Sequence, residues 1–363
     1  MKKVSLLMLC LQVILIISCK KQQVSMTELT ITPEENLVTT FKNPLLESGA
    51  DPYSTYKDGY YYYTHTVGNK IILWKTKYLS ELASAEKKVI WTPPENTMYS
   101  KQIWAPEVHF IRGKWYVYFA ADDGDNKNHR MYAIENSSDD PFQGEWVFKG
   151  KIASPSDKWA IDGNVFEHDN QLYMIWSGWE GDVNGIQDIF IAKMKNPYEM
   201  DSERTKISTP TYSWEKHTEV PDVNKNSPQV YVNEGPQFLS HDGQVFIVFS
   251  ASGCWTDFYC LGLLTFNEGE DLLDASAWSK HPEPLFVQSP ENGVYAPGHN
   301  SFFKSPDGTE DWILYHANLN PGDGCGEKRS SRMQKISWNE DGTPHLGIPY
   351  SLDKLLEIPS TDK

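Results

Sequence analysis

Residues 162–176 read Asp-Gly-Asn-Val-Phe-Glu-His-Asp-Asn-Gln-Leu-Tyr-Met-Ile-Trp, and this stretch contains the unit from which most of the chain is built. An acidic residue opens it, a short apolar run follows, Asp169-Asn170 interrupts the run, and an aromatic run ends at Trp176. Two such runs separated by turn residues predict a β-hairpin. The stretch therefore predicts a hairpin whose first strand begins at a carboxylate.

The same unit occurs five times along the chain. Its openings are Asp51, Trp104, Asp162, Glu234 and Ala296. Each spacing between openings leaves room for a sheet of four strands, and helical periodicity is hard to find between them. Five such sheets around one axis leave few strand edges exposed. The sequence therefore predicts an all-β, five-bladed β-propeller, a single domain over residues 41–357.

The N-terminal residues are typical of an export signal. Lys2 and Lys3 precede an almost wholly apolar run over residues 4–17, and Cys19 follows it. The run is too short for a stable membrane span, so residues 1–19 are predicted to be a signal peptide. Residues 16–19 resemble a bacterial lipobox, which predicts a lipid on Cys19 and a location in the cell envelope; cleavage without a lipid is the alternative. Residues 20–40 are polar and are predicted to be a tether.

Composition narrows the choice of partners. The formal net charge is −16 and the sequence pI about 5.1, so the surface repels phosphate backbones and a nucleic-acid partner is excluded. Aromatic residues make up 13% of the chain and suit both a packed core and stacking on sugar rings. Membrane contact is expected through the lipid anchor alone, and the protein is expected to be a monomer.

Three cysteines follow the predicted signal. Cys254, Cys260 and Cys325 are odd in number, so at most one intramolecular disulfide can form among them. A pair between Cys254 and Cys260, or three buried thiols, both remain open. There is no C-x-x-C pair, which argues against a zinc site.

The repeat predicts where chemistry takes place. The first strand of each propeller blade runs along the axis, so the five openings converge at one end, and three of them are acids: Asp51, Asp162 and Glu234. Like charges brought together raise one another's pKa values, and proteins usually retain such strain at functional sites. Carboxyls on opposite sides of a pocket suit glycoside hydrolysis, in which one protonates the leaving oxygen and another activates water or attacks carbon.

Four motifs resemble those of glycoside hydrolase family 43. They are Ala50-Asp-Pro-Tyr53, Trp104-Ala-Pro-Glu107, Ile161-Asp-Gly163 and Glu234-Gly-Pro236, and the resemblance extends from about residue 44 to about residue 350. It implies a five-bladed propeller and an inverting mechanism. Asp51 corresponds to the general base, Glu234 to the general acid, and Asp162 to the acid that orients Glu234 and adjusts its pKa.

The resemblance also suggests secondary positions. Trp104 would form a wall of the sugar subsite, and Arg332 would donate to a sugar hydroxyl or to the acid. His299 matches a histidine near the axis that often holds calcium through water. A role for this histidine in hydrogen bonding alone is equally open. No cofactor is expected to be required for activity. His65 would line the pocket or sit in the first hairpin, and Glu107 is expected to be a structural hydrogen-bond partner.

The expected substrate is a plant cell-wall glycan. Residues 298–317 and 341–349 resemble arabinofuranosidase members of the family, which implies removal of α-L-arabinofuranosyl residues from arabinan or arabinoxylan. Two alternatives are a β-xylosidase or other glycosidase of the same family, and a lipid-anchored propeller that binds glycans without cleaving them. A neighbouring five-bladed family that cleaves fructans with retention carries a different opening motif, which is absent around Asp51.

Overall fold

The computed structural model describes residues 39–218 and 229–361. The predicted signal peptide (1–19) and nearly all of the predicted tether (20–40) lie outside the described residues, as does the lipid site at Cys19. Among the described residues, no helix has the length and apolar character that crossing a membrane requires.

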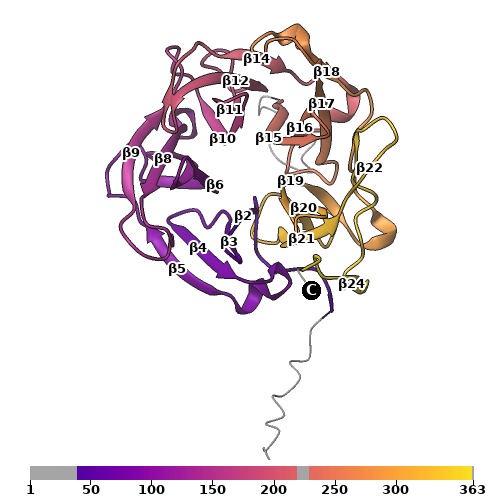
Figure 1. Ribbon diagram of the computed structural model, residues 1–363. Coiled ribbons are helices and arrows are strands. Elements are labelled where there is room, and N and C mark those ends of the chain that lie inside the picture. The colour runs from indigo at the N-terminus through magenta and orange to yellow at the C-terminus, as the bar shows by residue number, and fades with distance from the viewer. Residues whose placement is uncertain (1–38, 219–228, 362–363) are drawn as a thin grey trace, which may run out of the picture. The chain divides into compact units, whose positions relative to one another are not determined.

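The described chain forms five blades of antiparallel strands around a central axis, as predicted, and a short parallel pairing joins the third and fourth blades into one sheet (Figure 1). The first two blades have four strands each. Blade one comprises β2 (Tyr53–Lys57), β3 (Tyr60–Thr64), β4 (Ile71–Thr76) and β5 (Glu86–Trp91). Blade two comprises β6 (Lys101–Ile111), β7 (Lys114–Asp122), β8 (Arg130–Asn136) and β9 (Val147–Ile152).

The remaining three blades follow in chain order. Blade three comprises β10 (Ala160–His168), β11 (Gln171–Gly178), β12 (Ile186–Asn196), and the short β13 (Glu199–Met200) and β14 (Thr205–Ser208), which both pair with β12. Blade four comprises β15 (Tyr231–His241), β16 (Gln244–Ala251), β17 (Cys260–Phe266) and β18 (Trp278–Lys280). Blade five comprises β19 (Tyr295–Lys304), β20 (Asp311–Asn318) and β21 (Ser330–Lys335).

Short elements connect the blades. Five 3-10 helices lie in the described loops: η1 (Leu79–Ser84), η2 (Asn126–Asn128), η3 (Ser213–Glu215), η4 (Ala275–Ala277) and η5 (Pro290–Asn292). β22 (Ser337–Trp338) pairs with β23 (Pro344–His345). β1 (Thr40–Phe41) pairs with β24 (Leu356–Glu357), which brings the two ends of the propeller together.

The N-terminal segment completes the fifth blade. The backbone N–H of Leu45 donates to the carbonyl of Ser331 at 2.8 Å, and the N–H of Gly49 donates to the carbonyl of Arg329 at 2.8 Å. Residues 45–49 thus run along β21 and cover an edge that would otherwise be unpaired. Closure of the ring by the first and last parts of the chain removes an exposed sheet edge.

The hairpin turns explain why the sheets form. In the first four blades, two consecutive turn residues both have positive φ, the backbone of a type I′ turn, whose twist matches that of the strands. The pairs are Asp58-Gly59, Arg112-Gly113, Asp169-Asn170 and Asp242-Gly243. Apolar residues of the strands pack between blades, where five buried clusters each join one pair of neighbours.

Four of the five axial strands shift register at their opening, whereas β2 pairs with β3 without a shift. Pairing of β10 with β11 shifts register between Ile161 and Asn164, and pairing of β15 with β16 shifts between Glu234 and Gln237. Asp162 and Gly235 take positive φ at 58° and 54°. Asp162 is therefore equivalent to Gly235, and Glu234 is equivalent to Ile161. The repeat alignment placed Asp162 and Glu234 at one position, and the structure corrects this by one residue.

Candidate active site

A cavity of about 390 Å³ lies where the axial strands open. All three predicted carboxyls reach it. The lining residues are Asp51, Thr66, Trp104, Asn126, Trp159, Ile161, Asp162, Asn184, Gln187, Val230, Glu234, Cys254, Trp255, His299, Cys325 and Arg329. Aromatic walls with a few convergent charged groups are typical of a ligand site.

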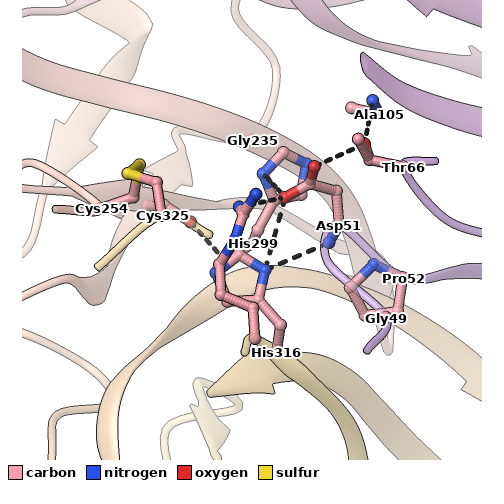
Figure 2. Close-up of polar contacts among 12 residues, drawn as sticks. Gly49, Asp51, Pro52, Thr66, Ala105, Gly235, Cys254, His299, His316 and Cys325 are labelled. Carbon is pink, nitrogen blue, oxygen red and sulfur yellow. Dashed lines mark hydrogen bonds and ion pairs between the residues drawn. A yellow bond between two sulfur atoms is a disulfide. The ribbon is translucent and has the colours of Figure 1, made fainter. Parts of the chain in front are cut away.

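Asp51 lies among cationic and hydrogen-bonding partners (Figure 2). Its Oδ1 lies 3.0 Å from Arg329 Nη1 and 3.2 Å from His299 Nδ1, and its Oδ2 accepts from Thr66 Oγ1 at 2.6 Å. The Asp51 N–H donates to His316 Nδ1 at 3.1 Å, which fixes its left-handed backbone. Burial raises the pKa of Asp51, but Arg329, His299 and His316 outweigh it and hold that pKa well below its usual range.

Asp162 and Glu234 show the opposite behaviour. Burial, together with the charges of Glu234 and Asp51, raises the pKa of Asp162 to about 7 against the opposing charge of His299. Burial also raises the pKa of Glu234, although His299 and the Tyr259 hydroxyl, which donates to Glu234 Oε1 at 2.8 Å, oppose it. The backbone N–H of Gly235 donates to Asp162 Oδ2 at 3.0 Å. This bond ties Asp162 to the residue that follows Glu234, so the two carboxyls are positioned together.

His299 lies between the three acids. Burial lowers its pKa, yet the charges of Asp51, Asp162 and Glu234 outweigh burial, and the pKa is raised overall. A protonated His299 therefore offsets part of the negative charge in the cavity. The Cβ that Gly235 lacks would lie 3.3 Å from the His299 ring, so glycine at 235 leaves room for the imidazole.

Asp162, Glu234 and His299 are also candidate ligands for a calcium ion. One nitrogen of His299 and one oxygen each of Asp162 and Glu234 lie within 4.8 Å of one another. Calcium takes about six to eight oxygen ligands, whereas this group offers two carboxylates and a nitrogen. A divalent ion would also stabilise the ionised forms of Asp162 and Glu234 and so remove the proton that burial retains there. As direct ligands, these residues do not fit a calcium ion beside a protonated acid; a calcium ion held at His299 through water stays a prediction.

One wall of the cavity is aromatic. Trp104 stacks on His129 with ring centroids 4.0 Å apart, and His129 Nδ1 lies 3.0 Å from Asp122 Oδ2, both side chains being fully buried. Trp159 stacks on Trp179 at 4.6 Å and 6°. The ring planes of Trp104 and Trp159 are thus fixed from behind, as a rigid sugar-binding surface requires.

Two predicted positions lie away from the cavity. Arg332 is fully buried behind the last blade, where its Nε donates to Ser330 Oγ at 3.0 Å and its Nη2 to the Asn318 carbonyl at 3.4 Å. The prediction that Arg332 meets the sugar or the acid is therefore wrong, and Arg329 lines the cavity instead. His65 is buried against Trp74, 4.6 Å between ring centroids, and does not line the cavity.

Glu107 takes the structural place expected of it. Its Oε2 accepts from Asn164 Nδ2 at 2.9 Å and lies 2.9 Å from His109 Nε2, and its Oε1 accepts from Gln237. These side chains come from the axial strands of blades two, three and four. They join the blades below the cavity and leave Glu107 no access to a substrate.

A disulfide borders the site, contrary to both expectations for the cysteines. Cys254 bonds to Cys325, and Cys260 is a free, buried thiol. The bond joins the loop between β16 and β17 to the loop between β20 and β21, and both cysteines line the cavity (Figure 2). Sequence reasoning also missed Arg329, Tyr259, His316 and Thr66, which hold the acids in place.

The fold and the cavity together define a propeller of the glycosidase class, with one carboxylate held ionised opposite two carboxyls whose pKa values are raised. The family model described as Glycosyl hydrolases family 43 matches residues 41–344. The chain belongs to glycoside hydrolase family 43, which confirms the resemblance drawn from the motifs.

Named relatives within this class are similar along most of the chain. An extracellular exo-α-(1→5)-L-arabinofuranosidase of Streptomyces avermitilis is 41% identical over 86% of this chain, and the match covers 64% of that protein. A protein of the same name from Streptomyces chartreusis is 36% identical over 76% of this chain and 82% of its own length. The crystal structure of α-L-arabinofuranosidase from Lactobacillus brevis matches with a TM-score of 0.79 and 36% identity, covering 86% of this chain and 98% of that one.

Proposed function

We propose that the protein is an inverting exo-acting glycoside hydrolase that removes α-L-arabinofuranosyl residues from plant cell-wall arabinan or arabinoxylan. One observation carries the proposal. A single cavity holds one carboxyl whose pKa is lowered and two whose pKa values are raised. Such a division supplies a base and an acid at the same pH. The names of the relatives from Streptomyces and Lactobacillus support the choice of sugar.

Each carboxyl has a distinct part in the proposed mechanism. Ionised Asp51 accepts a proton from water, which attacks the anomeric carbon, while Glu234 donates its proton to the departing oxygen. Arg329 and His299 keep Asp51 ionised, and Thr66 orients its second oxygen. Asp162 lies beside Glu234; the charge of Glu234 raises the pKa of Asp162, and whenever Asp162 is ionised its charge in turn favours the protonated form of the acid. Inversion would appear as the β-anomer of arabinose in the first product seen by NMR.

The direct test uses a panel of para-nitrophenyl glycosides with purified residues 20–363. We expect release from the α-L-arabinofuranoside; on arabinan oligosaccharides, whose sugar leaving group needs protonation far more than nitrophenolate does, Glu234→Gln should lower kcat by roughly 10²- to 10⁴-fold because the general acid is lost. Glu167→Gln is the matched control, since Glu167 is an exposed acid at the other end of the strand that carries Asp162. Full activity of Glu234→Gln would remove the acid role from Glu234.

The same panel separates the alternatives. Release from the β-D-xyloside alone would assign the chain to the β-xylosidases. Binding of arabinan oligosaccharides without turnover by the wild type would identify a glycan-binding propeller. The acid–base division at Asp51 and Glu234 favours catalysis over binding, because a binding site gains nothing from a proton donor kept protonated.

We further propose an envelope location, a lipid on Cys19, a monomeric state, and hydrolysis without a metal ion. The relatives named extracellular support export. Cys19→Ala should release the protein from membranes, and unchanged membrane association would exclude the lipid. Chelation with EGTA should leave kcat unchanged; a loss that calcium restores would place an ion at His299 after all.

A further inference from the structure

A second cavity of about 360 Å³ opens on the outer part of blade two. Its apolar lining comes from Tyr99, in the segment after β5, and from Tyr132 and Phe148 on β8 and β9. Tyr99 and Phe148 are partly exposed and stack with ring centroids 4.3 Å apart at 22°. Trp91 stacks behind Phe148 at 9°. The rings therefore form a fixed apolar surface that is partly exposed.

Polar groups border this aromatic surface. Arg130 Nε donates to Asp157 Oδ1 at 2.8 Å, and Lys151 donates to Asp157 Oδ2. Asn128 lines the same cavity. Mutual pairing of two cations with one carboxylate holds the charged groups in place, and their N–H groups and oxygens can hydrogen-bond the hydroxyls of a neutral ligand. Apolar rings beside fixed donors and acceptors are what a sugar ring, with its apolar face and polar rim, requires.

This cavity and the catalytic one share a wall. In η2, Asn126 lines the catalytic cavity and Asn128, two residues later, lines the second one. The segment before β10 also reaches both cavities, because Asp157 lines the second cavity and Trp159 lines the catalytic one. Trp159 Nε1 donates to the Asn126 carbonyl at 2.7 Å, which joins the two segments. In both segments, therefore, residues two apart in sequence line the two cavities.

We propose that the second cavity is a remote subsite for a neutral pentose of the same glycan whose terminal residue occupies the catalytic cavity. The proposal rests on the proposed function for its ligand. A chain that leaves the catalytic cavity over Asn126 and Trp159 enters the space lined by Asn128 and Asp157. Stacking on Tyr99 and Phe148 then contributes affinity for polymeric substrate and none for a substrate that fills the catalytic cavity alone.

The test compares a short and a long substrate in Tyr99→Ala and Met98→Ala. Met98 lies at the rim, 51% exposed, so its replacement spares the fold. We expect kcat/KM for the para-nitrophenyl arabinofuranoside to be unchanged. KM for long arabinan oligosaccharides should rise about three- to tenfold in Tyr99→Ala, with kcat unchanged. Tyr99→Phe, which keeps the ring, should restore the wild-type KM.

Tyr212→Ala is the matched control, because Tyr212 is partly exposed and stacks on Trp214 but lines neither cavity. Calorimetry in the Glu234→Gln background gives a readout independent of turnover, and Tyr99→Ala should weaken oligosaccharide binding there by the same factor. Equal effects of Tyr99→Ala on short and long substrates, or a similar effect of Tyr212→Ala, would overturn the proposal. So would a dimer that Tyr99→Ala dissociates, which would assign the cavity to a second copy. A wild type that hydrolyses none of these substrates would refute the proposed function. Calorimetry would still show whether Tyr99→Ala weakens oligosaccharide binding.

Discussion

Two buried aspartates in one cavity differ in their neighbours, and their pKa values diverge accordingly. Asp51 faces Arg329 Nη1 and His299 Nδ1 directly, whereas Asp162 accepts one backbone hydrogen bond and faces Glu234. Burial raises both pKa values, so the difference arises from nearby charge. A base and a protonated acid thus coexist because Arg329 and His299 lie beside Asp51.

Replacing Arg329 by Met tests whether the guanidinium keeps Asp51 ionised. Asp51 works when ionised, so activity is present above its pKa and is lost as the pH falls through that pKa. Removal of the guanidinium raises the pKa of Asp51, and the acid limb of the kcat/KM profile should move to higher pH. The alkaline limb, which reflects loss of the proton held by Asp162 and Glu234, should move less.

Lys328→Met is the control for Arg329→Met. Lys328 is the adjacent cation, but it is 68% exposed and pairs with Asp323. Lys328→Met should leave the acid and the alkaline limbs of the kcat/KM profile at the wild-type pH. An acid limb at the wild-type pH in Arg329→Met would show that His299 and His316 suffice to hold Asp51 ionised.

The choice between Arg329 and Arg332 also shows where sequence reasoning stops. Side chains alternate along a strand, so residues three apart face opposite sides, and only one of the two can face the cavity. Both lie in the same short motif, and nothing in it tells which. Arg329 precedes β21 at the end where the axial strands open, a fact that only the register of β20 with β21 supplies.

At the scale of the element, the bulges place the acids. A bulge adds a residue to one strand and turns the following side chains. Glu234 lies before the bulge of β15 and Asp162 within that of β10, so their carboxyls approach the cavity from different directions. The repeat of hairpins was readable from turns and aromatic runs, but a bulge leaves no mark in the pattern. For this reason the alignment of the openings was off by one residue.

The disulfide is a second element-scale device. It ties the loop that presents Arg329 to blade four, and the Gly322 N–H donates to Asp257 Oδ1 at 2.8 Å beside it. Because Cys254 and Cys325 have a sequence separation of 71, the Cys254→Ser, Cys325→Ser double variant should lower the free energy of unfolding by about 4 kcal/mol. Its acid limb should also move to higher pH, because Arg329 is then held less firmly.

Chemical denaturation and a pH profile measure both effects in the double variant. Cys260→Ala is the control, since Cys260 is a buried thiol outside the cavity. It should cost about 1 kcal/mol for lost packing and leave the acid limb unchanged. A double variant with the wild-type pH profile would mean that the loop is positioned without the disulfide.

On the scale of the whole molecule, the fold could be predicted because its information is local and repeated. Five turns and five aromatic runs each specify a hairpin, and closure follows from their number. The three acids could be predicted because they open repeated strands. Arg329, Tyr259 and the Cys254–Cys325 bond could not, because each depends on which loops of different blades meet at the axis.

One buried side chain at the start of the ring contributes to its closure. Asn43 is buried, its Nδ2 donates to the Met333 carbonyl at 3.0 Å, and its Oδ1 accepts the Met333 N–H at 3.0 Å. Asn43→Ala leaves two buried backbone groups of β21 without partners, which should lower the free energy of unfolding by about 2–4 kcal/mol. The melting temperature should fall by roughly 5–10 °C in one cooperative transition, because every blade packs on its neighbours.

Lys42→Ala, at the exposed preceding position, should melt like the wild type. Because Asn43 touches no residue of the cavity, kcat/KM at 25 °C should stay within about twofold of wild type, and calorimetry showing an early separate transition would mean that the fifth blade opens on its own.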